Sequence, residues 1–153
     1  MSVNTDLARF VGTWSGTNNL YLSWLDDPLR QSESILRVSL KANGQFIAFE
    51  YTWAYEGEPQ EGIILLGGDN KSDAVQTVWT DSWHSSHTFM LSDGQSKSDG
   101  SVSVKGFYKV EGHPDWGWRT DIIPADEKFR IVMYNVSPDG VEELAVETDY
   151  SRV

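Results

Sequence analysis

Turn-forming residues recur along nearly the whole chain, roughly 8 to 14 residues apart, and this spacing constrains the fold more than any other feature. The segments between them are short and alternate apolar with polar residues, which is the period of a β-strand with one buried face. Turns are expected at Asn43-Gly44, Gly57-Glu58-Pro59, Gly67-Gly68-Asp69-Asn70, Asp93-Gly94 through Asp99-Gly100, Gly112-His113-Pro114-Asp115, Pro124-Ala125-Asp126 and Pro138-Asp139-Gly140.

The segments between these turns predict about ten strands. They are expected over residues 10–19, 33–41, 45–55, 61–67, 73–82, 86–91, 101–110, 116–123, 128–136 and 141–151. One apolar face per strand argues against a parallel sheet, whose strands are apolar on both faces. The fold class predicted from spacing is all-β, as an antiparallel meander, sandwich or barrel, in one domain over residues 1–153.

Two segments near the amino terminus depart from this pattern. Asn4 or Thr5 is expected to cap a short helical turn that continues to Arg9. The connection over residues 18–31 is unusually apolar, and it has two interpretations. It is a lid over a cavity mouth, or the first strand continues through Leu22 and an ordinary turn follows at Asp26-Asp27-Pro28.

The composition excludes several classes of function. A formal net charge of −11 opposes approach to phosphate backbones and anionic membranes, so neither nucleic acid nor membrane is an expected partner. The absence of cysteine excludes disulfides, thiolate metal sites and cysteine nucleophiles. Neither a signal peptide nor an apolar membrane segment is visible, so we expect a cytoplasmic protein.

Aromatic residues gather on one face of the predicted strands. In the strand over residues 45–55, Phe49, Tyr51 and Trp53 share a face, while Glu50 lies on the other. With aromatic residues of later strands, they could line a pocket or fill a solid core. The ligand-lining candidates are Phe49, Tyr51, Trp53, Trp79, Asp81, Tyr108 and Trp118.

The densest group of chemically functional side chains lies over residues 81–87. Asp81 shares a face with Trp79, so its carboxylate should be buried; it could anchor the following turn, pair with an arginine such as Arg119 or Arg130, or orient a ligand. His84 and His87 fall in a predicted hairpin turn and are expected to be solvated. No metal site is expected, because no diagnostic ligand spacing accompanies the two histidines.

Three short motifs together resemble an uncharacterised bacterial family of lipocalin-like domains, a domain of unknown function in the wider calycin superfamily. The motifs are Gly12-Thr13-Trp14-Ser15-Gly16, Val78-Trp79-Thr80-Asp81-Ser82, and the ending that runs from Gly117-Trp118-Arg119 to Asp149-Tyr150-Ser151-Arg152. The resemblance implies a closed antiparallel up-and-down β-barrel of about ten strands with a central cavity. It also implies that Gly12, Trp14 and Arg152 are structural, with Trp14 packed beneath the guanidinium at the closed end.

The function expected from these features is the binding of a small hydrophobic molecule, as a carrier or sensor, with no cofactor. One alternative is a cavity-based enzyme of isomerase, cyclase or hydrolase type that uses Asp81 or His84. A second is an interaction or homodimer module that uses the apolar first loop. Haem binding is a further branch, in which His84, His87 or His113 would be the ligand, since the histidine that a related barrel family uses near the carboxyl end is absent here.

Overall fold

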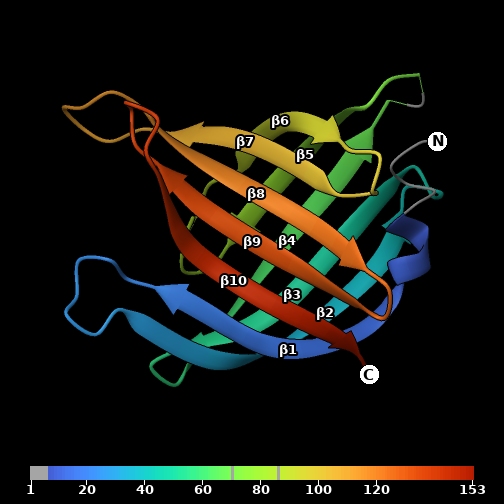
Figure 1. Cartoon of the computed structure of the whole chain (residues 1–153), viewed down its shortest axis with the longest axis horizontal. Helices are drawn as coiled ribbons and strands as arrows, with labels where there is room; N and C mark the ends of the chain where they lie inside the picture. Colours follow the sequence, from blue (N-terminus) through green and yellow to red (C-terminus); the bar gives the residue numbers. More distant parts are fainter. Residues whose placement is uncertain (1–6, 70, 86) are drawn as a thin grey trace.

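In the computed structural model, which describes residues 7–69, 71–85 and 87–153, ten antiparallel strands close into a barrel (Figure 1). The strands are β1 (Gly12–Tyr21), β2 (Leu29–Lys41), β3 (Phe46–Tyr55), β4 (Glu58–Gly68), β5 (Ala74–Asp81), β6 (Met90–Ser96), β7 (Val102–Tyr108), β8 (Trp116–Ala125), β9 (Lys128–Val136) and β10 (Glu142–Arg152). Each strand pairs with its neighbours in sequence, and β1 pairs with β10 to close the barrel. The predicted all-β class and the closed barrel are confirmed.

The alternating strand directions give the barrel two distinct ends (Figure 1). The open end, at the left of the figure, carries the loops that follow β1, β3, β5, β7 and β9. The closed end, at the right, carries both termini and the 3₁₀ helix η1 (Ala8–Phe10). The predicted helical turn is therefore present, whereas its expected caps Asn4 and Thr5 lie outside the described residues. No helix within the described residues is long and apolar enough to cross a membrane.

The closed end is packed around Trp14, which is 0% exposed. Its ring meets Phe129 edge-on at a centroid distance of 4.8 Å, and its indole N–H donates to the carbonyl of Phe10 at 2.8 Å. The guanidinium carbon of Arg152 lies 4.3 Å from the Trp14 ring centroid, in a cation–π contact. Gly12 leaves room for this guanidinium, because a Cβ there would lie 2.8 Å from its Nη1 atom.

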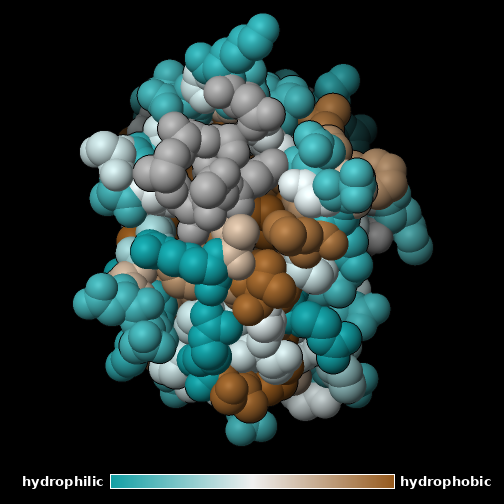
Figure 2. Space-filling view, turned by 90° about the vertical axis from the view of Figure 1, so that its right-hand side faces the viewer, coloured by the Kyte–Doolittle hydropathy of each residue, from teal (hydrophilic) through white to brown (hydrophobic). Residues whose placement is uncertain are grey.

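Arg152 also links the ends of the chain. It donates hydrogen bonds to the carbonyls of Arg9 at 2.8 Å and Val11 at 3.1 Å. Figure 2 views this end of the barrel and shows a largely hydrophilic rim around a group of hydrophobic side chains. Val11 and Val153 are among the exposed hydrophobic residues of these terminal segments. The Arg152 guanidinium therefore holds residues 9–11 against the end of β10.

The alternating faces of the strands are as expected, but some boundaries differ. In β3, Ile47, Phe49 and Trp53 are buried, and Glu50 lies on the outer face with Thr52. The expected turn at Asp93-Gly94 is wrong, because both residues lie inside β6. Gly94 belongs there because a Cβ would clash with the backbone carbonyl of Ser103 on β7. At this position in the sheet, the glycine permits a close approach between the backbones of β6 and β7, and it does not form a turn.

The backbone of the connection over residues 18–31 agrees with the second of its two interpretations, a continued first strand followed by an ordinary turn. β1 continues to Tyr21, and a compact turn over residues 22–28 is closed by the bond from the Leu22 N–H to the Pro28 carbonyl, at 2.8 Å. Trp24 in this turn is 73% exposed. Residues 20–24 nevertheless form one wall of a small pocket at the open end.

We predict that Trp14→Ala lowers the free energy of unfolding by about 3–5 kcal/mol, since it removes a fully buried indole and leaves a cavity. Chemical denaturation followed by circular dichroism measures the change. Trp24→Ala is the matched control, because this indole is exposed and its removal should change stability little. Equal midpoints for Trp14→Ala and the parent chain would contradict the structural role of Trp14.

Candidate functional site

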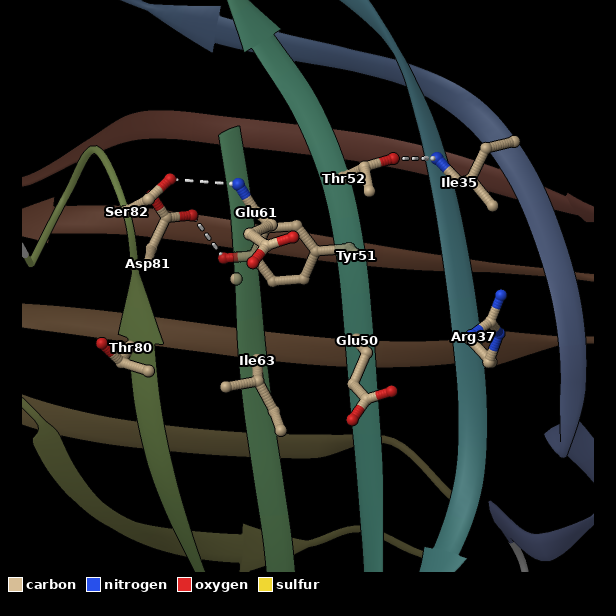
Figure 3. A pocket seen from close by; sticks show the side chains of 11 residues that line it. Ile35, Arg37, Glu50, Tyr51, Thr52, Glu61, Ile63, Thr80, Asp81 and Ser82 are labelled. Carbon is tan, nitrogen blue, oxygen red and sulfur yellow. Dashed lines mark hydrogen bonds between the residues drawn. The ribbon is translucent and has the colours of Figure 1, made fainter. Parts of the chain in front are cut away.

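A row of three residues crosses the interior of the barrel near the open end. Tyr51 on β3 is the register partner of Gly62 on β4, which in turn is the partner of Asp81 on β5. Gly62 leaves the space through which the Tyr51 phenol extends, and a Cβ there would clash with the phenol and lie 2.9 Å from Asp81 Oδ2. The phenol therefore reaches across β4 and donates to Asp81 at 2.7 Å (Figure 3).

The Asp81 carboxylate accepts four hydrogen bonds. Its Oδ2 atom accepts from the Tyr51 hydroxyl and, at 3.1 Å, from the Trp53 indole N–H. Its Oδ1 atom accepts from the backbone N–H groups of Trp83 at 2.9 Å and His84 at 3.0 Å. An ionised carboxylate offers about four lone-pair sites, so this carboxylate has none left for a ligand. The geometry is that of an anchor for the turn after β5.

Neither arginine considered as a partner reaches Asp81. Arg119 pairs with Asp121 at 3.3 Å and with Glu142 at 2.6 Å. Arg130 pairs with Glu147 and Asp149 on β10. Of the alternatives for Asp81, the structure shows hydrogen bonding and not an ion pair with Arg119 or Arg130, because donors from the barrel interior take the place of a cation.

The Asp81 network extends through Tyr51 to a third indole. The Trp79 indole N–H donates to the Tyr51 hydroxyl oxygen at 2.9 Å. Burial, together with the negative charge of Asp81, raises the pKa of Tyr51 well above its ordinary value of 10.0. The phenol therefore keeps its proton and remains the donor to Asp81.

The turn anchored by Asp81 places His84 across the open end of the barrel. Four indole rings surround the imidazole, with centroid distances of 5.6 Å to Trp53, 5.6 Å to Trp79, 4.8 Å to Trp83 and 5.4 Å to Trp118. The Trp53 ring is stacked on the imidazole, and Trp83 meets it edge-on. The expectation that His84 is solvated in its turn is wrong, because the turn folds inward over the aromatic interior.

Burial lowers the pKa of His84 below its ordinary value of 6.5, and the nearby Asp81 carboxylate opposes this only in part. The imidazole is therefore neutral near neutral pH. His87 is exposed, as is His113 in the loop after β7. The described residues hold no cluster of three or more side chains suited to a metal ion.

Three cavities meet at His84. The first, the interior void, has a volume of about 20 Å³ and is lined by Tyr51, Trp53 and Asp81 among others. The second, the loop pocket, has about 100 Å³ and lies against residues 20–24. The third, the mouth pocket, has about 500 Å³ and is lined by Trp79, His84, Ser85, Thr88, Phe89, Met90, Phe107, Tyr108, Lys109 and Trp118.

These volumes separate the residues predicted to line a ligand cavity. Pockets for small molecules have volumes of roughly 300–1,000 Å³, a range that the mouth pocket reaches and the other two do not. Trp79, Tyr108 and Trp118 line the mouth pocket. Tyr51, Trp53 and Asp81 line the interior void, which is large enough for about one water molecule. Phe49 packs against Phe129 in the closed half and lines none of the three.

Part of this site could not be recognised in the sequence, because one strand boundary was predicted wrongly. Because a strand was expected over residues 86–91, Thr88 and Phe89 were placed in a regular strand, whereas β6 begins only at Met90. Phe89 is 76% exposed, in the loop that forms one wall of the mouth pocket. Asn135 was also not predicted. Its side-chain oxygen accepts a hydrogen bond from the Tyr108 hydroxyl at 2.6 Å, at the end of the barrel.

A groove of about 530 Å³ runs over the outside of β2 to β5, and Tyr51 and Asp81 line it as well as the interior void (Figure 3). Arg37, Glu50 and Glu61 are among its polar side chains, and Gly62 lies in its floor. Its charged groups face outward on strand surfaces, so it lacks the aromatic enclosure of the mouth pocket.

Residues 3–152 match a protein family described as "Protein of unknown function (DUF1579)". The chain belongs to the DUF1579 family. Among solved structures, the "Crystal Structure of Rv2717c from M. tuberculosis" is similar, with a TM-score of 0.69 and 8% sequence identity. The similarity covers 99% of this protein and 97% of the Rv2717c chain, and it shows a shared fold. No curated protein matches the sequence.

We predict that Asp81→Ala lowers the free energy of unfolding by at least about 2 kcal/mol, because the Trp53 indole and the turn lose a buried, charged acceptor. Thermal and denaturant unfolding measure the change. Asp126→Ala removes a carboxylate from an exposed turn and serves as the matched control. A stability loss no larger than that of the control would contradict the anchoring role.

We predict that the DUF1579 protein loses stability as the pH falls below 6.5, in part through His84. As the pH falls, the unfolded chain binds the histidine proton before the folded chain does, because the pKa of His84 is lower in the folded state. The resulting loss of folding stability is absent above pH 6.5 and grows as the pH falls toward the folded pKa. Unfolding measured at about pH 7.5 and about pH 5.5 should show a smaller pH effect in His84→Gln than in the parent chain. His87→Gln changes an exposed histidine and should keep the parental effect; an equal pH effect in His84→Gln and the parent would contradict the assignment.

Proposed function

We propose that this DUF1579 protein binds a small hydrophobic molecule in the mouth pocket, at the open end of a lipocalin-like barrel. The observation that carries the proposal is a ligand-sized pocket of about 500 Å³ with aromatic walls, above an interior that is nearly filled. The expected role is that of a carrier or sensor, with the ligand at the rim rather than deep within the barrel.

The walls of the mouth pocket suit a flat apolar molecule. Trp79 and Trp118 are stacked, with an interplanar angle of 12° and a centroid distance of 5.3 Å, and they offer an extended aromatic surface. Met90 at the start of β6 adds a flexible thioether, and Phe89 just before it adds an exposed ring. Methionine adapts to ligand shape, and aromatic rings offer a rigid apolar surface.

The base of the pocket is rigid. His84 forms part of it, enclosed by indole rings and attached to the turn that Asp81 anchors. Trp79 is held by its hydrogen bond to Tyr51. A surface prepared in this way lowers the ordering cost that binding must otherwise overcome.

Titration with N-phenyl-1-naphthylamine, an uncharged fluorescent aromatic probe, tests the proposal. We predict saturable one-to-one binding to the parent chain and a loss of affinity of about tenfold or more in Phe89→Asp, which places a carboxylate in the apolar wall. Phe89 is exposed, so the substitution should leave the fold intact.

Leu91→Asp is the matched control. Leu91 is 70% exposed and lies two residues along the chain, on β6, but it does not line the mouth pocket. Its variant should bind the probe as the parent does. Absence of saturable binding to the parent, or an equal loss of affinity in the two variants, would overturn the assignment of the mouth pocket.

A further inference from the structure

The outer faces of β6 and β7, which are neighbours in the barrel wall, carry apolar side chains where an antiparallel sheet usually presents polar ones (Figure 1). Leu91 on β6 is 70% exposed and Phe107 on β7 is 62% exposed, although both lie within regular strands. Asp93 on β6 is the register partner of Lys105 on β7. The same antiparallel pairing, continued by two residues toward the open end, brings Leu91 beside Phe107. Val78 on β5 is the partner of Leu91, so three strands share this apolar outer surface.

A groove and a projecting ring lie side by side on this surface. The groove has a volume of about 510 Å³ and runs over the outside of β4 to β6, where its lining includes Leu65, Val78, Leu91 and Asp93. Phe107 does not line this groove and lies beside it on the next strand. One face therefore offers both a hollow and a side chain that can fill a hollow. Such a face is self-complementary, which suits a second copy of the same chain.

The two charged side chains of this surface are not paired with each other. The Cε atom of Lys105 lies over Gly117 of β8, 2.7 Å from the position that a Cβ would take there, and its Nζ atom is 5.3 Å from the Phe107 ring centroid. The lysine is therefore directed toward β8 and away from Asp93. Asp93 instead accepts a hydrogen bond at Oδ1 from the side chain of Gln76 at 3.0 Å. Among the residues that the structure describes, neither Asp93 nor Lys105 forms an ion pair.

The surface of β6 and β7 is electrically balanced in a strongly acidic chain. With a net charge of −11, two copies of the chain repel each other over most of their surfaces. The strands β6 and β7 together contain one acidic residue, Asp93, and one basic residue, Lys105. A second copy can therefore approach these strands without adding to the repulsion, provided that its own charges are placed opposite the complementary ones.

We propose that two copies of this chain associate through the outer faces of β6 and β7. A two-fold axis parallel to these strands and between them sets Leu91 against Phe107 of the second copy. The same axis sets Asp93 against Lys105 of the second copy, and symmetry supplies both contacts in reverse. Each Phe107 then covers the edge of the other copy's groove. Each Lys105 gains the carboxylate from which it is turned away within its own chain.

The apolar area is sufficient for a dimer of modest affinity. Leu91 and Phe107, with the partly exposed Val78 beside them, leave roughly 300 Å² of apolar side-chain surface uncovered on each copy. Because an interface is about 57% apolar, this corresponds to about 500 Å² buried per copy and about 1,000 Å² in total. That total lies at the lower limit for a specific interface, so we expect a dissociation constant in the micromolar range.

The apolar first loop, which the sequence suggested as a dimer contact, is less suited to this role. Trp24 is exposed there, but so are Asp26 and Asp27 beside it. A two-fold contact through this loop would bring the like charges of both copies together. The association through β6 and β7 also goes beyond the proposed function, since Leu91, Asp93 and Lys105 do not line the mouth pocket.

Sedimentation velocity at protein concentrations of about 1 to 200 μM tests the proposal. The parent chain should shift from monomer toward dimer over this range. Leu91→Asp places a carboxylate in the apolar contact and should raise the dissociation constant at least about tenfold. Val141→Asp is the matched control, because it changes an exposed apolar residue in the loop after β9 and should dimerise as the parent does.

Charge reversal distinguishes a second copy from any other occupant of this surface. Asp93→Lys alone, or Lys105→Asp alone, places like charges opposite each other across the two-fold axis and should weaken the dimer at least about tenfold. The double variant exchanges the two charges and should return the dissociation constant to within about threefold of the parental value. Both side chains are exposed, so circular dichroism should show an intact fold in all three variants.

A parent chain that stays monomeric at every concentration would overturn the proposal, and so would a dimer that Leu91→Asp leaves intact or that the double charge variant fails to restore. Flotation with phosphatidylcholine vesicles tests the other occupant. If the parent is monomeric and floats with the vesicles while Leu91→Asp does not, the surface binds lipid rather than a second copy. Binding of N-phenyl-1-naphthylamine to Leu91→Asp tests the mouth pocket separately, so either proposal can fail while the other stands.

Discussion

The open end of this barrel depends on one buried carboxylate. Asp81 accepts four hydrogen bonds, two from interior side chains on β3 and two from the backbone of the turn that follows it. It thereby couples the barrel wall to the start of the turn after β5, at Trp83 and His84. Gly62 is a condition of this arrangement, because any side chain on β4 at that position would block the phenol of Tyr51.

The consequence of this anchoring is a barrel that is closed by aromatic rings at both ends in different ways. At the closed end, Trp14 is sealed beneath the Arg152 guanidinium, with Phe129 below it. At the open end, His84 lies among indoles in the position where a cavity would otherwise be accessible. Large rings directed inward from many strands fill the barrel radius, so the interior of the barrel holds only a small void and the mouth pocket lies at the rim.

The neutral state of His84 fits this placement. Its pKa is lowered because the imidazole is partly buried among indole rings, and the nearby carboxylate is already occupied by other donors. The surrounding indoles offer no acceptor to a charged imidazole, because an indole nitrogen only donates.

Much of the architecture could be predicted from the sequence, because it depends on local rules. Alternation in the strand that contains Phe49, Tyr51 and Trp53 identified the inward face, and turn chemistry indicated the number of strands. The errors arose where a residue has two uses. Gly94 resembles a turn glycine but serves close strand packing, and His84 lies in a polar turn that folds inward.

By itself, the sequence determined the all-β class and the burial of Asp81 beside Trp79, since both follow from a periodicity of two or from turn geometry. The spacing left meander, sandwich and barrel open, and the up-and-down barrel was implied only by the family resemblance. Only the tertiary structure decided which aromatic rings meet, which donors reach Asp81, and how much space remains between them. Those outcomes depend on the register of strands far apart in sequence, and a period of two carries no information about it. The location of the mouth pocket is therefore a property of the closed barrel and not of any one of its strands.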